Sequence, residues 1–166
     1  MGLVAWSGSG KTTLLCQLLK YFKQQGKRVG MIKHAHHDVE FDSKGKDSYK
    51  LRKAGASQML LATAKRWALM VDLEETATEP NLQQMVNQLD QENLDFILVE
   101  GFKHTAFHKI EVHRSTLDKP LIYPNDKDII AVITDNPSLI QDKKTLDLNN
   151  IQEVADFLLT MLHPSQ

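Results

Sequence analysis

The sequence has a single cysteine, no excess of charge of either sign, and no hydrophobic run long enough to span a membrane. One cysteine excludes an internal disulfide and fits a reducing compartment. The formal net charge of −1 lacks the basic excess that general nucleic-acid binding requires. A transmembrane helix needs about 18 or more consecutive apolar residues, and the first residues do not resemble a signal peptide. We therefore expect a soluble, cytoplasmic protein that binds neither nucleic acid nor a membrane.

The chain also has no internal repeat, low-complexity tract or linker that would divide it. Its 166 residues, 42% of them hydrophobic, match the size and composition of one globular domain. We predict a single nucleotide-binding domain over residues 1–166, with a β-hairpin extension at about residues 57–72.

Strand-like and helix-like segments alternate along the chain, which predicts an α/β fold. An apolar strand at residues 2–5 is followed by a helix at 11–25, and a second strand follows at 28–33. Cys16 lies among the apolar residues of this helix and is predicted to be a buried thiol. Further helices are predicted at 47–54, at 80–91 and after Asn150. Core strands are predicted at 94–99 and 129–133, and a half-exposed strand at 109–113. Residues 57–62 and 66–71 are predicted to form an antiparallel hairpin with Trp67 packed in its core.

The segment AWSGSGKTT, residues 5–13, indicates a phosphate-binding P-loop. Small residues let successive backbone N–H groups point at phosphate oxygens, and the following helix N-terminus adds its dipole. Lys11 would reach the β- and γ-phosphates, and the Thr12 hydroxyl would ligate Mg²⁺. Ala5 stands where the usual pattern has glycine, which a negative φ tolerates. The residues predicted to bind phosphates are Ser7, Gly8, Ser9, Gly10, Lys11, Thr12 and Thr13.

Together these patterns predict a P-loop NTPase fold, with three α/β/α layers, a mostly parallel sheet and the antiparallel hairpin. Parallel β-α-β units place their ligands beyond the carboxyl ends of the strands. Glu100 ends the apolar strand LDFILV and is followed by glycine, as in a Walker-B strand. It would hold Mg²⁺ together with Thr12, directly or through water. The alternative is a solvated glutamate at an ordinary strand end.

The segment KHAHHD, residues 33–38, follows the second strand at the same edge and allows three functions. Lys33 and His34, with His36 and His37, could contact phosphate or an anionic partner. Asp38 could position the attacking water or Mg²⁺, which makes it the candidate catalytic residue. The histidines could instead bind a transition metal such as Ni²⁺ or Zn²⁺. A solvated polar loop is the fourth possibility.

Asp135 follows the strand at 129–133, where P-loop proteins often recognise the base. A carboxylate there can accept hydrogen bonds from both N1–H and N2–H₂ of guanine, which adenine cannot supply. A complete N-K-x-D signature is absent, and Asp135 precedes Asn136 and Pro137, so it could instead start a turn. We keep Asp135 as the candidate guanine-reading residue, with the turn as the alternative.

With these pieces assembled, the sequence resembles the molybdopterin-guanine dinucleotide biosynthesis adaptor proteins, the MobB family. The resemblance covers nearly the whole chain in the expected order, and its IKHAHHD and LVEGFKH segments are specific to this family rather than to P-loop proteins at large. The matching segments are AWSGSGKTTLL, IKHAHHD, GKDSYKLRKAGA, RWALM, LVEGFKH and AVITDNP.

The resemblance implies a homodimeric protein with GTP and Mg²⁺ as cofactors and a weak GTPase activity. Such a protein would act beside the guanylyltransferase that joins GMP to molybdopterin, and would meet molybdopterin or its guanine dinucleotide. Family members dimerise by extending a β-sheet between protomers, so the hairpin at 57–72 and its neighbouring strand are the expected interface. The sequence by itself shows a β-rich segment that could equally be a lobe of the monomer. Two alternatives remain open, a P-loop small-molecule kinase with Asp38 as its base, and a metal-insertion GTPase that uses the histidine loop.

Overall fold

The structure is a computed structural model that describes residues 1–35, 39–73 and 80–162. The chain divides into two compact units, one formed by residues 1–34 and 81–166 and the other by residues 35–80. We call them the sheet unit and the hairpin unit. No helix within the described ranges is long and apolar enough to cross a lipid bilayer.

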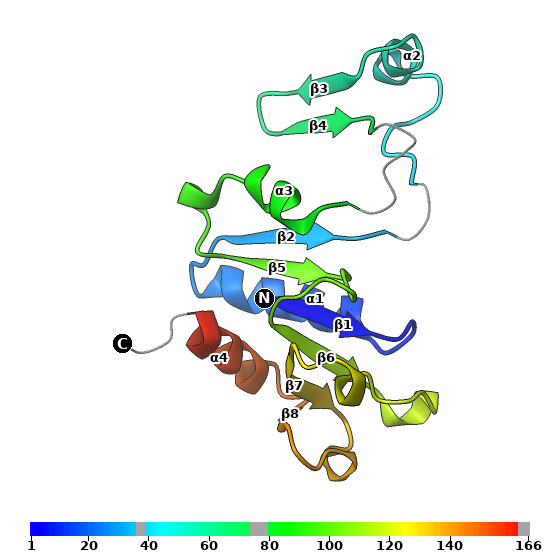
Figure 1. The fold of residues 1–166 in the computed structure, drawn as a ribbon. Coiled ribbons are helices and arrows are strands. Elements are labelled where there is room, and N and C mark those ends of the chain that lie inside the picture. Colours follow the sequence, from blue (N-terminus) through cyan, green and yellow to red (C-terminus); the bar gives the residue numbers. More distant parts are fainter. Residues whose placement is uncertain (36–38, 74–79, 163–166) are drawn as a thin grey trace. The chain divides into compact units, whose positions relative to one another are not determined.

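The sheet unit is built on a six-stranded sheet in which every neighbouring pair is parallel (Figure 1). Parallel pairing sends all the strand carboxyl ends to one edge, the edge on which the sequence analysis predicts the site. In spatial order the strands are β2 (Val29–Lys33), β5 (Phe96–Glu100), β1 (Gly2–Ala5), β6 (Lys109–His113), β7 (Ile129–Thr134) and β8 (Lys144–Asp147).

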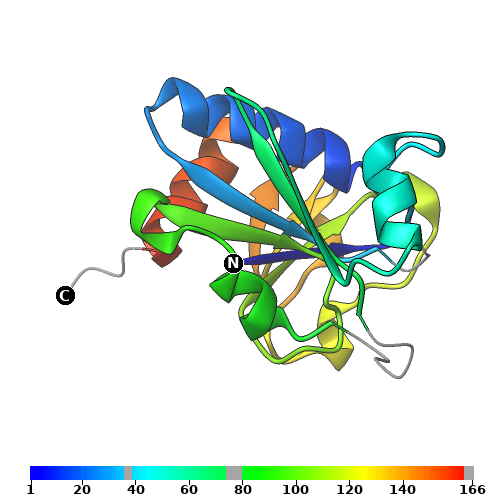
Figure 2. The ribbon, with the colours of Figure 1, turned by 90° about the horizontal axis from the view of Figure 1, so that it is seen from above.

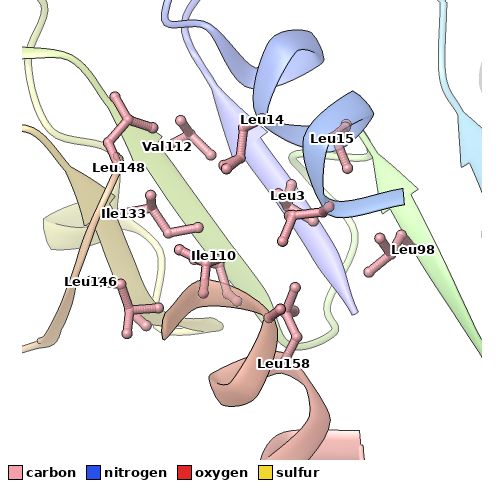
Figure 3. Packing of buried hydrophobic residues seen from close by; sticks show 14 of the residues in the cluster. Leu3, Leu14, Leu15, Leu98, Ile110, Val112, Ile133, Leu146, Leu148 and Leu158 are labelled. Carbon is pink, nitrogen blue, oxygen red and sulfur yellow. The ribbon is translucent and has the colours of Figure 1, made fainter. Parts of the chain in front are cut away.

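Helices α1 (Lys11–Gln24) and α4 (Ile151–Leu162) cover one face of this sheet, and α3 (Leu82–Asn87) lies on the other (Figure 2). Apolar residues of α1 and α4 interlock with inward residues of the strands (Figure 3). Burying each such side chain contributes about 1.5–3 kcal/mol. The labelled core residues are Leu3, Leu14, Leu15, Leu98, Ile110, Val112, Ile133, Leu146, Leu148 and Leu158.

Two helix predictions need correction. Cys16 is exposed, because Leu14, Leu15 and Leu18 turn the buried stripe of α1 away from it. Helix α3 is shorter than predicted. It begins after Asn81, whose side chain accepts a hydrogen bond from the Gln84 N–H (3.1 Å), and a tightened 3₁₀-type turn ends it. The remaining helical turns are η1 (Gln91–Asn93), η2 (Ser115–Leu117), η3 (Tyr123–Asn125) and η4 (Pro137–Leu139).

Strand β6 is buried along its whole length, so the prediction that it is half-exposed was wrong. Its alternation is real, since Ile110 faces the apolar core while Lys109, Glu111 and His113 share the opposite face. Loops, rather than solvent, cover that face. The Lys109 ammonium donates to the carbonyls of Lys103 (3.0 Å) and Thr105 (2.9 Å) and pairs with Asp126 (2.7 Å).

Glu111 fixes the loop that follows β6. Its fully buried carboxylate accepts hydrogen bonds from the N–H groups of Ile122 (2.9 and 3.0 Å) and Tyr123 (2.9 Å). Burial raises the pKa of the Glu111 carboxyl, and these N–H donors oppose that rise by stabilising the charged form.

The Glu111→Ala variant should lose about 3 kcal/mol of stability, because it leaves the partly buried N–H groups of Ile122 and Tyr123 without their acceptor. At roughly 2–4 °C per kcal/mol for a chain of this size, thermal unfolding should shift down by about 6–12 °C. Melting curves would measure the shift, with the exposed Glu92→Ala as the control. Equal midpoints for the two variants would show that Glu111 does not fix the loop.

The hairpin unit contains helix α2 (Asp47–Lys53) and the predicted antiparallel hairpin, formed by β3 (Gln58–Ala62) and β4 (Trp67–Val71). Arg52 is the buried centre of this unit. Its guanidinium pairs with Glu40 and with Asp72 (2.9 Å), so it joins the segment before α2 to the segment after β4. Removing one partner of such a shielded ion pair is destabilising, because the other charge stays buried.

One face of the hairpin is apolar and exposed within its own unit. The register places Leu60 opposite Leu69 and Ala62 opposite Trp67, on the same face as Val71. Trp67 is 66% exposed and Leu60 is 58% exposed, so the prediction that Trp67 packs in a hairpin core was wrong. A two-stranded sheet cannot bury both of its faces, and a hairpin alone is marginally stable in water.

Candidate functional site

The loop between β1 and α1 has the backbone of an anion cradle. Gly8 (φ 83°) and Gly10 (φ 85°) are both left-handed, a conformation that favours glycine. The Ser9 N–H donates to the Trp6 carbonyl (3.3 Å), which closes the turn, and α1 begins directly after Gly10. The first N–H groups of a helix have no intrahelical acceptor, so this helix start can bind an anion.

Ser9 supplies a second sign of a polar ligand. The residue is 2% exposed, and within the described part of the chain its hydroxyl has no hydrogen-bond partner. A buried hydroxyl without a partner costs about 1–3 kcal/mol, so such groups in native proteins need an explanation. An oxygen of a ligand held in the loop would supply the missing partner.

Glu100 ends β5, which runs between β1 and the edge strand β2. The register pairs Glu100 with Leu3 of β1 and with Lys33 of β2. Its largely buried carboxylate forms an ion pair with the Lys11 ammonium, and the Lys33 ammonium lies 3.4 Å away. The structure thus brings together three of the residues that the sequence analysis predicted to share a site.

His34 lies directly beside this cluster. Its N–H donates to the Glu100 carbonyl (2.9 Å), and its ring lies 4.8 Å from the ring of Phe102. At Gly101 (φ 91°), a Cβ would approach the Cβ of His34 to 3.0 Å, so glycine is needed there. The backbone therefore holds His34 at the strand-end edge.

Three residues of the histidine loop, His36, His37 and Asp38, lie outside the described residues, so the candidate catalytic aspartate stays a prediction. Among residues 1–35, 39–73 and 80–162, no three histidine, cysteine or carboxylate side chains gather to hold a metal ion. The transition-metal alternative depends on the histidines that are not described.

Asp135 follows β7 at the same edge and is engaged by its neighbours. Its Oδ1 accepts a hydrogen bond from the Ser115 N–H (2.8 Å), and its Oδ2 lies 3.8 Å from Nη1 of Arg114. The Ser115 N–H, with help from the Arg114 charge, lowers the pKa of the Asp135 carboxyl. Base recognition by Asp135 stays a prediction.

Sequence reasoning missed the segment after β6. The Trp6 indole N–H donates to the Pro120 carbonyl (2.7 Å), and Nη2 of Arg114 lies 3.2 Å from where a Cβ on Gly10 would stand. The segment after β6 therefore packs against the glycine-rich loop between β1 and α1, called the phosphate-type loop below. The sequence signal that could have indicated this segment was Arg114, a basic residue directly after β6, which ends at the same edge of the sheet.

The fold and this edge define an α/β protein with a parallel sheet and a glycine-rich loop between its first strand and first helix. Residues 1–135 match the model of the MobB family, described as molybdopterin guanine dinucleotide synthesis protein B. The chain is 44% identical over 160 residues to the molybdopterin-guanine dinucleotide biosynthesis adapter protein of Escherichia coli (strain K12), covering 96% of this chain and 90% of the relative. The protein of the same name from Haemophilus influenzae is 42% identical over 164 residues, 98% of this chain and 89% of the relative. The chain belongs to the MobB family, and so to molybdopterin guanine dinucleotide biosynthesis.

Solved structures confirm the fold class. A crystal structure of molybdopterin-guanine biosynthesis protein B has a TM-score of 0.76 at 24% identity and covers 97% of both chains. The crystal structure of Bacillus subtilis MobB has a TM-score of 0.71 at 23% identity, covering 99% of this chain and 98% of that one. The parallel six-stranded sheet and the separate hairpin are thus those of the family.

Proposed function

We propose that this chain is a GTP-binding adapter protein that assists the guanylyltransferase attaching GMP to molybdopterin, with a weak Mg²⁺-dependent GTPase activity. The observation that carries the proposal is the glycine-rich loop of β1 and α1 beside the Lys11–Glu100 ion pair. Family membership and the relatives named as adapter proteins support the pathway.

The phosphates of GTP would lie in the loop of residues 7–13. Lys11 would exchange its Glu100 partner for the β- and γ-phosphate oxygens, and Ser9 would gain a hydrogen-bond acceptor. Thr12 and the freed Glu100 carboxylate would then hold Mg²⁺, an ion that prefers oxygen ligands. Lys33 and His34 lie beside Glu100 and would face the γ-phosphate or the phosphate of the pterin.

Hydrolysis in such a site needs positioning and charge neutralisation rather than a covalent intermediate. Lys11, Lys33 and the metal would neutralise the developing charge on the phosphoryl oxygens. Asp38 would position the attacking water. We expect this hydrolysis to be slow, because the Glu100 carboxylate beside Lys11 and Lys33 would be held by the metal and would not act as a general base.

The proposed partners are a second copy of this chain, through the exposed face of β3 and β4, and the guanylyltransferase with its molybdopterin substrate. The adapter role is tested by adding this protein and GTP to a reaction of the guanylyltransferase with molybdopterin. We expect the yield of guanine dinucleotide to rise. A yield unchanged at every ratio of the two proteins would contradict the adapter role.

The Glu100→Gln variant should lose the Mg²⁺ dependence of GTP binding. Glutamine keeps the shape of the side chain but removes the charge that the cation needs, so GTP affinity in Mg²⁺ should fall roughly tenfold, about 1.4 kcal/mol. Titrations with and without Mg²⁺ would measure it, with the exposed Glu92→Gln as a matched control. A full Mg²⁺ effect in Glu100→Gln would remove this residue from the metal site.

A further inference from the structure

A hollow lies next to the phosphate-type loop, and all the residues that line it belong to the sheet unit. It has a volume of about 260 Å³ and is bounded by Gly10, by Thr13 and Gln17 of α1, by Arg114, and by Asn149 in the turn between β8 and α4. This volume lies below the range of about 300–1,000 Å³ that is typical of small-molecule pockets, so the hollow has room for part of a nucleotide rather than for a dinucleotide. Its walls combine apolar and polar side chains, as ligand sites do.

Arg114 forms the boundary between the hollow and the loop. Its Nη2, Nε and Cζ lie 3.2, 3.8 and 3.9 Å from where a Cβ on Gly10 would stand, so the guanidinium packs against the glycine backbone. Asp135 holds the other side of the group, with Oδ2 3.8 Å from Nη1. Arg114 is therefore set beside the phosphate-type loop with hydrogen-bond donors at the wall of the hollow.

Asn149 also lines the hollow and carries an amide. Its backbone N–H and its Nδ2 donate to Oδ1 of Asp147, at 2.8 and 3.3 Å. With the amide nitrogen bonded in this way, the carbonyl oxygen is the atom suited to accept a hydrogen bond from a ligand. The side chain is exposed, and Leu148 beside it is buried in the core, which fixes the turn.

We propose that this hollow binds the purine base and ribose of the nucleotide, with Arg114 and Asn149 selecting guanine. The inference rests on the proposed function, because it requires that the adjoining loop hold the phosphates. Guanine offers an acceptor, O6, next to a donor, N1–H, whereas adenine carries a donor, the N6 amino group, in place of O6. A guanidinium donor and an amide acceptor match guanine and oppose adenine.

In this arrangement Asp135 acts through Arg114 rather than on the base. Both of its oxygens are already directed to other groups, one to the Ser115 N–H and one to Arg114. Asp135 is then a positioning residue. This role differs from the direct guanine recognition that the sequence suggested, and the two can be told apart.

The test measures the Kd of GTP, ATP and tripolyphosphate, each with Mg²⁺, for the wild-type chain and for Asn149→Ala. We expect GTP binding by Asn149→Ala to weaken about tenfold, as for loss of one base contact, with tripolyphosphate unchanged. The control is Asn87→Ala, an exposed asparagine of α3, which should match the wild type. An unchanged ratio of GTP to ATP affinity in Asn149→Ala would overturn the inference.

Variants of Arg114 and Asp135 separate the remaining outcomes. Arg114→Ala should lose the GTP preference and keep tripolyphosphate affinity, and an equal loss of both would make it a phosphate ligand and overturn its role here. Made alone, Asp135→Asn should lower the ratio of GTP affinity to ATP affinity. Added to Arg114→Ala, it should have no further effect on that ratio. A wild-type chain that binds tripolyphosphate without preferring GTP contradicts this inference alone. A chain that binds none of the three contradicts the proposed function as well.

Discussion

Replacing Lys11 by alanine is expected to weaken Mg²⁺-GTP binding about 100-fold, or roughly 2.7 kcal/mol, and to leave the fold intact. The Lys11 ammonium is the cation at the start of α1, and in the structure it pairs with Glu100. Truncation removes the charge offered to the phosphates. It also leaves the Glu100 carboxylate nearby, which would repel the same anion.

The fold should survive because Glu100 keeps its second cation, Lys33, at 3.4 Å, and because the buried stripe of α1 does not include Lys11. Calorimetric titration would measure the affinity and circular dichroism the thermal unfolding. Lys20→Ala, on the exposed side of the same helix, is the matched control. Unaltered GTP binding in a folded Lys11→Ala protein would refute the role of this lysine.

The second large effect is expected on oligomeric state. Replacing Leu60 and Leu69 together by lysine should convert the proposed dimer into a monomer. The two leucines face each other across β3 and β4 on the exposed face, so the change places like charges in the centre of an apolar patch. Analytical ultracentrifugation at several concentrations would measure the shift in mass.

The control for the hairpin variant is Leu139→Lys, an exposed leucine in η4 of the sheet unit. It changes surface hydrophobicity and charge without touching the hairpin, so its mass should equal that of the wild type. A wild-type chain that is monomeric at every concentration would contradict the interface. So would a double variant that remains dimeric.

The parts of the fold that follow from local pattern were predicted well. The strand, glycine-rich loop and helix of residues 2–24 carry their own periodicity and turn residues, and the structure has them nearly where expected. The hairpin was predicted because two strand-like runs flank a three-residue turn-like segment, and the antiparallel pairing of β3 with β4 confirms it. Local signals of this kind do not depend on what the element later packs against.

Burial was predicted less well, because it depends on distant parts of the chain. The alternation of β6 predicts that its polar residues are solvated, yet the segments that contain Thr105 and Tyr123 bury them. The apolar face around Trp67 looks like a core, yet nothing in its own two-stranded sheet can cover it. Strand β8 was not predicted at all, because only Leu146 of its four residues is buried.

The candidate site shows the same division. Lys33 and Glu100 were expected to meet because parallel strands end at one edge, and the register of β2 and β5 pairs them. Arg114 could not be assigned in this way. Its position depends on a side chain crossing to Gly10 and on the neighbouring β7 presenting Asp135, and neither relation is visible in the order of residues.

The most direct test of the central claim is a calorimetric titration of the wild-type chain with GTP and with ATP, each with and without Mg²⁺. The account predicts saturable binding of GTP that Mg²⁺ strengthens, and weaker binding of ATP under the same conditions. Absence of Mg²⁺-dependent GTP binding, or a clear preference for ATP, would contradict it.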